Sequence, residues 1–165
     1  MSYLSTLTLS HFRSHKGARL SADQRPVAIY GANGSGKTNI LEAISLFSPG
    51  RGLRRSSAED MMRRPDNLGW KVGGILTAAA TEYEVEITSN NGAARQVKID
   101  GKPKAQTALG QLVRILWLVP AMDRLFADAP SSRRRFLDRM VGGFIPGYGG
   151  LLGAYEKALR ERARL

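Results

Sequence analysis

The pattern of apolar and polar residues predicts a strand, a loop and a helix in the first 47 residues. Residues 4–9 alternate apolar with hydroxyl side chains, as a half-buried strand does, and a basic, aromatic turn follows at 11–15. Residues 27–30 form a short apolar run that predicts a buried strand. Residues 39–47 carry apolar side chains at positions 40, 41, 44 and 47, which is the spacing of a helix.

The middle of the chain has the pattern of an antiparallel meander. Residues 70–79, 82–88 and 96–99 are strand-like. Turn signals stand between them at Asn90-Asn91-Gly92 and after them at Asp100-Gly101. We therefore expect a β-meander subdomain over about residues 70–104, inserted after the first helix.

Beyond the meander, the apolar run at 115–119 predicts a second buried strand, which Pro120 ends. Ser131 or Ser132 is expected to cap the next helix, which has its apolar residues on one face. The glycine pair at 142–143 and the pair Pro146-Gly147 are expected to end that helix.

The last helix is predicted to begin at Gly150 and still runs at Leu165, without a glycine cap or a proline stop. No apolar strand that ends in Asp or Glu follows Val119, although a phosphate-loop enzyme needs such a carboxylate near its magnesium ion. We therefore expect residues 1–165 to be the first lobe of a longer protein, with the start of a helical second lobe at about 150–165.

The segment between the first predicted helix and the strand before it is rich in glycine. Its sequence, Gly31-Ala32-Asn33-Gly34-Ser35-Gly36-Lys37-Thr38, matches the pattern G-x-x-x-x-G-K-[ST] at every fixed position. Glycines in this pattern let the main chain approach phosphate oxygens, so that successive N–H groups and the helix N-terminus donate to the anion. We expect Lys37 to contact the terminal phosphates and the Thr38 hydroxyl to ligate Mg²⁺, while the Asn33 amide could reach the γ-phosphate or orient a water. A glycine turn before a core helix is the alternative.

Composition narrows the classes of function. A chain of 165 residues with 42% hydrophobic and 24% charged residues suits one soluble globular domain. It has no cysteine, which excludes disulfides, thiol catalysis and cysteine-ligated zinc. His11 and His15 are too few for a histidine-rich metal site, and we interpret them as surface or hydrogen-bonded residues. Because no apolar run approaches the ~20 residues of a membrane span and the N-terminus lacks a leader pattern, we infer a cytoplasmic protein.

The chain is strongly basic, with 25 Lys and Arg against 14 Asp and Glu and a formal charge of +11. Such an excess favours a polyanionic partner such as nucleic acid, because each neutralised phosphate releases condensed counterions. The alternative is that a partner segment, or another part of the same polypeptide, carries the balancing acidic residues.

Two groups of arginines are candidate DNA contacts. The first group lies in the loop after the first helix, where backbone phosphates could be met, and the second lies in the first turn of the helix after residue 130. Cations at a helix N-terminus interact unfavourably with the helix macrodipole. Arginines at such positions could therefore serve to bind phosphate or a carboxylate across an interface. Solvated charge is the alternative for both groups. The residues are Arg51, Arg54, Arg55, Arg63 and Arg64 in the first group and Arg133, Arg134 and Arg135 in the second.

Three other residues are assigned structural roles. Glu42, one turn past the glycine loop, is interpreted as a solvated helix residue. Trp70 and Trp117 lie in strand patterns and are expected in the core, with base stacking as a minor option.

In order and spacing, these segments resemble the RecF family of bacterial recombination and replication-repair ATPases, which is similar to SMC-class and ABC-type ATPase heads. The resemblance covers nearly the whole chain. It implies an α/β fold, the first, ATP-binding lobe of a P-loop NTPase head of the ABC/SMC type, with a mixed sheet and an antiparallel β-meander. The segments that carry it are 11–14, 31–44, 50–55 and 120 through 132–138.

The resemblance also implies a function in DNA replication, DNA repair and the SOS response. It implies ATP and Mg²⁺ binding, ATP-dependent homodimerisation with nucleotide between the heads, and binding to double-stranded DNA near single-strand gaps. Loading of RecA together with RecO and RecR is implied as well. The family's signature sequence and magnesium-supporting carboxylates lie beyond residue 165, so no catalytic residue is assigned. The implied nucleotide contacts are Gly31, Ala32, Asn33, Gly34, Ser35, Gly36, Lys37, Thr38, Asn39 and, as a phosphate contact, Arg13.

Two other functions stay open. A nucleotide or small-molecule kinase shares the phosphate loop, but it predicts a lid of arginines and an acceptor pocket. A nucleic-acid-binding fragment that acts by charge alone, without ATPase activity, predicts that Lys37→Ala leaves binding intact. The ATP-dependent switch predicts instead that nucleotide affinity collapses in that variant.

Overall fold

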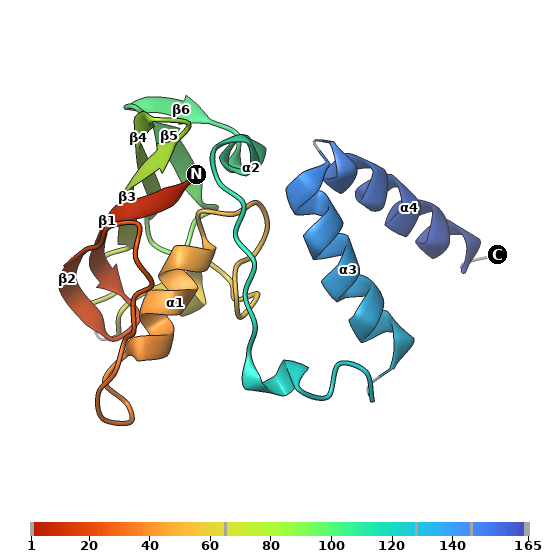
Figure 1. The fold of residues 1–165 in the computed structure, drawn as a ribbon, viewed down its shortest axis with the longest axis horizontal. Helices are drawn as coiled ribbons and strands as arrows, with labels where there is room; N and C mark the ends of the chain where they lie inside the picture. Colours follow the sequence, from red (N-terminus) through yellow and green to blue (C-terminus); the bar gives the residue numbers. More distant parts are fainter. Residues whose placement is uncertain (1, 65, 128, 146, 164–165) are drawn as a thin grey trace. The chain divides into compact units, whose positions relative to one another are not determined.

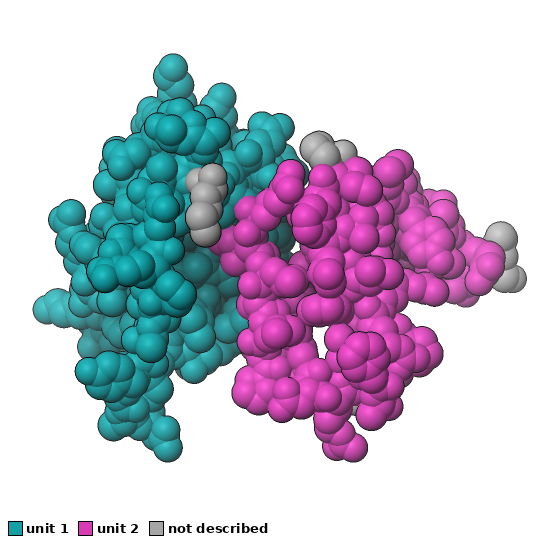
Figure 2. Space-filling model, viewed as in Figure 1, with its two compact units in different colours: residues 1–113 teal, residues 114–165 magenta. Residues whose placement is uncertain are grey.

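The structure, a computed structural model, describes residues 2–64, 66–127, 129–145 and 147–163. The chain divides into two units, 1–113 and 114–165, coloured teal and magenta in Figure 2. No helix in the described ranges combines the length and the apolar character that crossing a membrane requires.

A single antiparallel sheet forms most of the first unit (Figure 1). Its strand order is β2-β1-β3-β4-β5-β6. The strands are β1 (Tyr3–Phe12), β2 (His15–Ser21), β3 (Trp70–Ala78), β4 (Thr81–Ser89), β5 (Gln96–Ile99) and β6 (Lys102–Lys104). The strand predicted at 4–9 and the three meander strands are confirmed. The edge strands β2 and β6 were missed because neither has a run of apolar residues, and β3 pairs with β1, so the meander continues the N-terminal hairpin in one sheet.

Helix α1 (Lys37–Ser45) and the turn after it cover one face of this sheet. Phe47, at the end of that turn, is fully buried, as the helical pattern predicted. A Cβ atom on Gly74 of β3 would lie 2.7 Å from the Phe47 ring, so a glycine is required for this close approach. Burial of one such aromatic side chain stabilises the fold by about 1.5–3 kcal/mol. The core residues of the strands are Leu7, Leu9, Phe12, Trp70, Val72, Leu76, Val85, Ile87, Val97 and Ile99.

The segment between α1 and β3 is tied to the end of β1. It contains the short helix η1 (Glu59–Met61), and the backbone N–H of Arg13 donates to the Met61 carbonyl at 2.9 Å. Trp70 is buried, as predicted, with its ring 5.4 Å from that of Phe12 and its Nε1 donating to the Ala58 carbonyl. Two further short helices, η2 (Gln106–Ala108) and α2 (Leu109–Leu112), end the unit.

Two predicted strands are wrong. Residues 27–30 and 115–119 have no regular secondary structure, and neither segment pairs with a strand in the described ranges. Val27 is 64% exposed, Tyr30 93% and Leu118 74%. A strand needs a neighbour's backbone donors and acceptors, and an apolar run by itself does not supply them.

The second unit contains η3 (Pro120–Met122), α3 (Pro130–Phe144) and α4 (Tyr148–Arg162). The predicted serine cap is wrong, because α3 begins with Pro130 and its N-cap residue is Ala129. Proline suits the first helical position because its ring fixes φ and it lacks an N–H group that would go unpaired there.

The predicted bounds of these two helices are confirmed in part. The glycine pair at 142–143 lies inside α3, which ends at Phe144, just before the second predicted break at Pro146-Gly147. Helix α4 begins at Tyr148, two residues before the predicted start. The Tyr148 hydroxyl donates to Asp138 Oδ1 at 2.7 Å, which ties the two helices together and raises the pKa of Tyr148. Trp117 is not in a strand, and the guanidinium of Arg139 lies 4.5 Å above its ring.

Candidate nucleotide-binding site

The glycine loop leads directly into α1, as the motif predicted. Gly31, Gly34 and Gly36 have φ angles of 151°, 83° and 91°, in the region that residues with a Cβ rarely adopt. Gly36 is also the N-cap residue of α1, and a Cβ atom there would lie 2.6 Å from the imidazole of His15 and 2.8 Å from the Ser14 hydroxyl. The turn between β1 and β2 therefore fixes the helical end of the loop.

Lys37 bridges the loop from the first position of α1. Its Nζ donates to the Gly31 and Ala32 carbonyls, each at 2.7 Å. The first N–H groups of α1 have no side-chain cap, and residues 31–35 are exposed. Uncapped N–H groups and the positive end of the helix dipole favour an anion at this point, and the Lys37 ammonium is already beside it.

The residues offer an oxygen donor for a magnesium ion beside the loop. Thr38 is the second residue of α1 and is exposed, and a hydroxyl oxygen suits a hard cation that also takes phosphate oxygens and waters as ligands. In the described part of the chain, no cluster of three or more His, Cys, Asp or Glu residues is arranged to hold a metal. The assignment of Thr38 to Mg²⁺ stays a prediction.

The two histidines do not form a pair. The His11 Nε2 atom lies 3.7 Å from Asp66 Oδ2, and the His15 Nε2 atom lies 3.3 Å from the Gly36 carbonyl oxygen. Both rings are therefore near hydrogen-bonding or charged groups, as predicted.

Glu42 on α1 is completely buried, so its interpretation as a solvated residue is wrong. Its Oε1 and Oε2 accept from Nη2 and Nε of Arg13 at 2.6 and 2.8 Å, and Oε2 also accepts from Nη1 of Arg54 at 2.9 Å. A carboxylate tolerates burial when guanidinium groups neutralise it and supply its hydrogen bonds. The sequence signal was the position of Glu42, four residues before the buried Leu46 and so on the buried stripe of the helix.

This cluster of Arg13, Glu42 and Arg54 extends to the loop. Arg54 Nη1 also donates to Asn39 Oδ1 at 2.9 Å, and Asn39 Nδ2 donates to the Ser14 hydroxyl at 2.9 Å. Asn39 is two residues beyond Lys37, so the network connects the start of α1 with the turn that packs on Gly36. The structure thus brings together several predicted nucleotide contacts and one predicted DNA contact, Arg54.

Arg13 is held firmly by protein groups. Besides Glu42, its Nη1 donates to the Asp60 carbonyl at 2.5 Å and its Nη2 to the Ser56 hydroxyl at 2.7 Å. Its side chain is 18% exposed, against 41% for Arg54. The role of Arg13 as a phosphate contact stays a prediction, and the structure adds a second role as the anchor of Glu42.

A cavity of about 340 Å³ adjoins this network. It is lined by Arg13, Ser14, Asn39, Asp60, Met62 and Arg64. Hydrogen bonds from the Ser57 side chain and backbone hold the pKa of Asp60 below its usual value. The cavity has polar groups on several sides and lies next to the start of α1, where the loop would hold an anion.

The other arginines predicted to contact DNA fall into separate places. In the first unit, Arg63 Nη1 donates to Asp66 Oδ2 at 2.7 Å, and Arg51, Arg55 and Arg64 are exposed. In the second unit, the first turns of α3 carry the remaining three. Arg134 and Arg135 are exposed there, while Arg133 Nη1 donates to the Phe126 carbonyl at 3.1 Å.

The chain is similar to known proteins over nearly its whole length. Residues 3–119 match the family described as the RecF/RecN/SMC N-terminal domain. The DNA replication and repair protein RecF of Rhizobium rhizogenes is 42% identical over 167 residues, which cover 99% of this chain and 44% of the relative. The chain therefore spans less than half the length of that curated relative.

Two solved structures share the fold. The recombination mediator protein RecF-ATPrS in the RecFOR pathway matches with a TM-score of 0.88 and 27% identity, over 99% of this chain and 44% of that one. The same mediator as RecF-ATP matches with a TM-score of 0.79 and 27% identity, over 98% of this chain and 45% of that one.

Proposed function

The chain belongs to the family of RecF/RecN/SMC N-terminal domains, and on this premise we propose that it is the ATP-binding part of a RecF-like protein of DNA replication and repair. The observation that carries the proposal is the loop at 31–36, with glycines at positive φ and Lys37 bridging it at the start of α1. Such a loop wraps a triphosphate with backbone N–H groups.

Each residue of the loop has a chemical task in this proposal. The glycine N–H groups and the start of α1 hold the phosphate oxygens. The Lys37 ammonium releases its hydrogen bonds to the Gly31 and Ala32 carbonyls and donates to the terminal phosphates instead. Thr38 ligates Mg²⁺, and Asn33 and Asn39 contact the nucleotide. The relative solved as RecF-ATP supports ATP as the nucleotide.

The buried cluster supports the loop electrostatically. Arg13 and Arg54 carry two positive charges against the single negative charge of Glu42, so the cluster has a net positive charge beside the start of α1. A phosphate at the loop is attracted by that excess, because charges in a partly buried site are weakly screened. Glu42 positions both guanidinium groups, and Asn39 connects one of them to the helix.

We extend the proposal to the assembly that the family resemblance implies. In it, ATP supplies contacts to a closed homodimer that binds double-stranded DNA near single-strand gaps in the cytoplasm, together with RecO and RecR and in support of RecA loading. The formal charge of +11 favours the DNA partner. The comparisons match RecF and favour neither the kinase nor the charge-only alternative.

The test is the binding of a fluorescent ATP analogue with Mg²⁺ to the 165-residue chain and to two lysine variants. Lys37→Ala is expected to abolish saturable binding, because it removes the ammonium beside the phosphates. Lys16→Ala removes the same charge from the exposed strand β2 and is expected to bind as the parent does. Equal binding by the Lys37→Ala variant and the parent would refute the site.

A further inference from the structure

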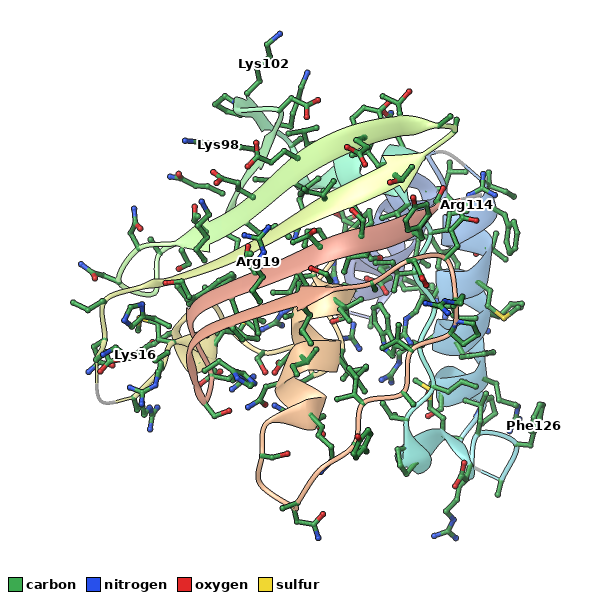
Figure 3. All side chains as sticks on the ribbon, turned by 60° about the vertical axis from the view of Figure 1, so that its left-hand side comes forward. Lys16, Arg19, Lys98, Lys102, Arg114 and Phe126 are labelled. Carbon is green, nitrogen blue, oxygen red and sulfur yellow. The ribbon has the colours of Figure 1, made fainter. Side chains whose placement is uncertain are left out.

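A second cavity, of about 480 Å³, lies at the β5–β6 edge of the sheet. Figure 3 shows Lys98 and Lys102 at this edge and Lys16 at the opposite one. No acidic residue is among its described lining residues, which are Arg95, Gln96, Val97, Lys98, Pro103, Lys104, Ala105 and Gln106. The lining combines three cations, two amides and three apolar residues, and no carboxylate among these residues neutralises the cations.

Arg95 and Gln106 come together in this cavity on one backbone carbonyl. Arg95 Nη2 and Gln106 Nε2 both donate to the Gly50 oxygen, at 2.8 and 3.0 Å. Lys104 pairs across the strands with Val97, so both lie on the face of the sheet that is buried in β5. Arg95 immediately precedes β5, and Gln106 follows β6. The shared Gly50 carbonyl and the cavity lining thus place one guanidinium, one ammonium and one amide near each other.

The Arg95 guanidinium is incompletely satisfied. Its Nη1 atom is buried and has no hydrogen-bond partner among the described residues. Burial, and then the charge of the neighbouring Arg51, hold the pKa of Arg95 below its usual value. An unpaired buried donor and two adjacent like charges are both unfavourable. An anion in the cavity offsets the like charges, and a turn of the guanidinium toward the anion pairs the donor.

We propose that this cavity is a phosphate-binding site, with Arg95 and Lys104 as its charged ligands and Gln106 as a neutral donor. A guanidinium donates two parallel hydrogen bonds to a phosphate, and Arg95, which lines the cavity, has one donor atom, Nη1, without a partner among the described residues. An ammonium adds a point charge. The phosphate is either a phosphodiester of a nucleic-acid backbone or a free phosphate ion, since both present the same oxygens.

This site is separate from the nucleotide loop. Gly50 follows the C-terminal end of α1, whereas the loop is at the N-terminal end, and a helix of nine residues is about 13 Å long. If the bound phosphate group belongs to nucleic acid, the inference rests on the proposed DNA binding. Binding of a free phosphate ion does not rest on that proposal. The two sources can therefore be tested separately.

The experiment measures thermal unfolding of the whole chain in increasing inorganic phosphate. The parent melting temperature is expected to rise with phosphate concentration, because a ligand that binds the folded state stabilises it. Arg95→Gln and Lys104→Gln are expected to lose the part of this rise that comes from the cavity, while the part that comes from phosphate at the nucleotide loop is expected to persist. Phosphate also stabilises proteins by exclusion from their surface, and that part of the rise is expected to persist in every variant, including the control Lys16→Gln.

A second arm measures anisotropy of a labelled DNA duplex over a range of salt concentrations. If the phosphate comes from DNA, each of the two site variants is expected to weaken binding and to reduce the slope of log K against log salt by about one. If the slope is unchanged but the phosphate-dependent rise is lost, the ligand is free phosphate and the site stands. Failure of the parent to bind DNA would count against the proposed function alone, because the phosphate arm still decides the site.

Two results would overturn the proposal. One is a phosphate-dependent rise as large in Arg95→Gln and Lys104→Gln as in the parent. The other is an equal loss in Lys16→Gln, which would assign the effect to net charge. Arg95→Gln also removes a partly buried guanidinium whose Nη1 is unpaired among the described residues, and is expected to melt above the parent without phosphate, which checks that the variant is folded.

Discussion

Glu42→Gln tests whether the buried cluster holds the first unit together. The substitution keeps the size of the side chain but removes its charge, so that Arg13 and Arg54 lose their common counter-charge. Loss of one partner from a buried ion pair costs about 3–5 kcal/mol. Arg54 is 41% exposed and can turn to water, whereas Arg13 is 18% exposed and bonded on several sides. We therefore expect the lower end of that range, about 3 kcal/mol.

A loss of this size is measurable by urea unfolding. With a slope of about 1–3 kcal/mol per molar urea, a loss of about 3 kcal/mol is expected to lower the midpoint by roughly 1–3 M. Trp70 is a suitable fluorescence probe because it is buried against Phe12 in the same unit, and far-UV circular dichroism provides a second probe. Glu82→Gln, at an exposed position of β4, is the matched control and is expected to shift stability by less than about 0.5 kcal/mol.

A double-mutant cycle then separates the cluster from its parts. Arg54→Gln alone leaves Glu42 paired with Arg13, so its cost is expected to be smaller than that of Glu42→Gln. In the double variant the two costs are expected not to add, because the residues share one hydrogen bond. A Glu42→Gln midpoint within about 0.3 M of the parent would show that the buried carboxylate contributes little, and our account of the cluster would be wrong.

Two further predictions concern other positions of the first unit. Gly74→Ala is expected to destabilise the fold by about 1–3 kcal/mol, because its Cβ atom would lie 2.7 Å from the Phe47 ring. Urea unfolding measures this loss, and an unchanged free energy of unfolding would contradict the prediction. Asp60 has a pKa below its ordinary 3.8, so its contribution to stability is complete above that pH and is lost as the pH falls through the lowered pKa. Asp60→Asn is therefore expected to reduce the acid sensitivity of unfolding below about pH 4, and an unchanged pH profile would oppose this assignment.

The glycine loop could be predicted because all its information is local. Its eight residues are contiguous, and their φ angles and the start of α1 follow from the residue types. The strands of the meander were also visible, because alternation with turn signals is a local pattern.

Glu42 could not be placed in the same way. Its partners lie 29 residues before it and 12 residues after it, so only the folded chain brings them together. In the sequence, Arg54 is one basic residue among several. Nothing near it distinguishes it from Arg55, although Arg54 is the residue that donates to Glu42. The proposed phosphate-binding cavity at the β5–β6 edge could not be predicted for the same reason. Its residues come together through strand pairing and through Gly50, which lies 45 residues before Arg95.

The phosphate-binding loop is held unequally at its two ends, and this bears on how nucleotide binding works. At the helical end, Gly36 packs against the β1–β2 turn. At the other end, residues 27–30 pair with no strand in the described ranges, and Tyr30 is 93% exposed. Lys37 closes the loop by donating to two of its carbonyls, and a bound phosphate would compete for that ammonium. Because ordering a residue costs about 1–2 kcal/mol, we expect the proposed binding of ATP to depend on what orders the segment before the loop as well as on the loop itself.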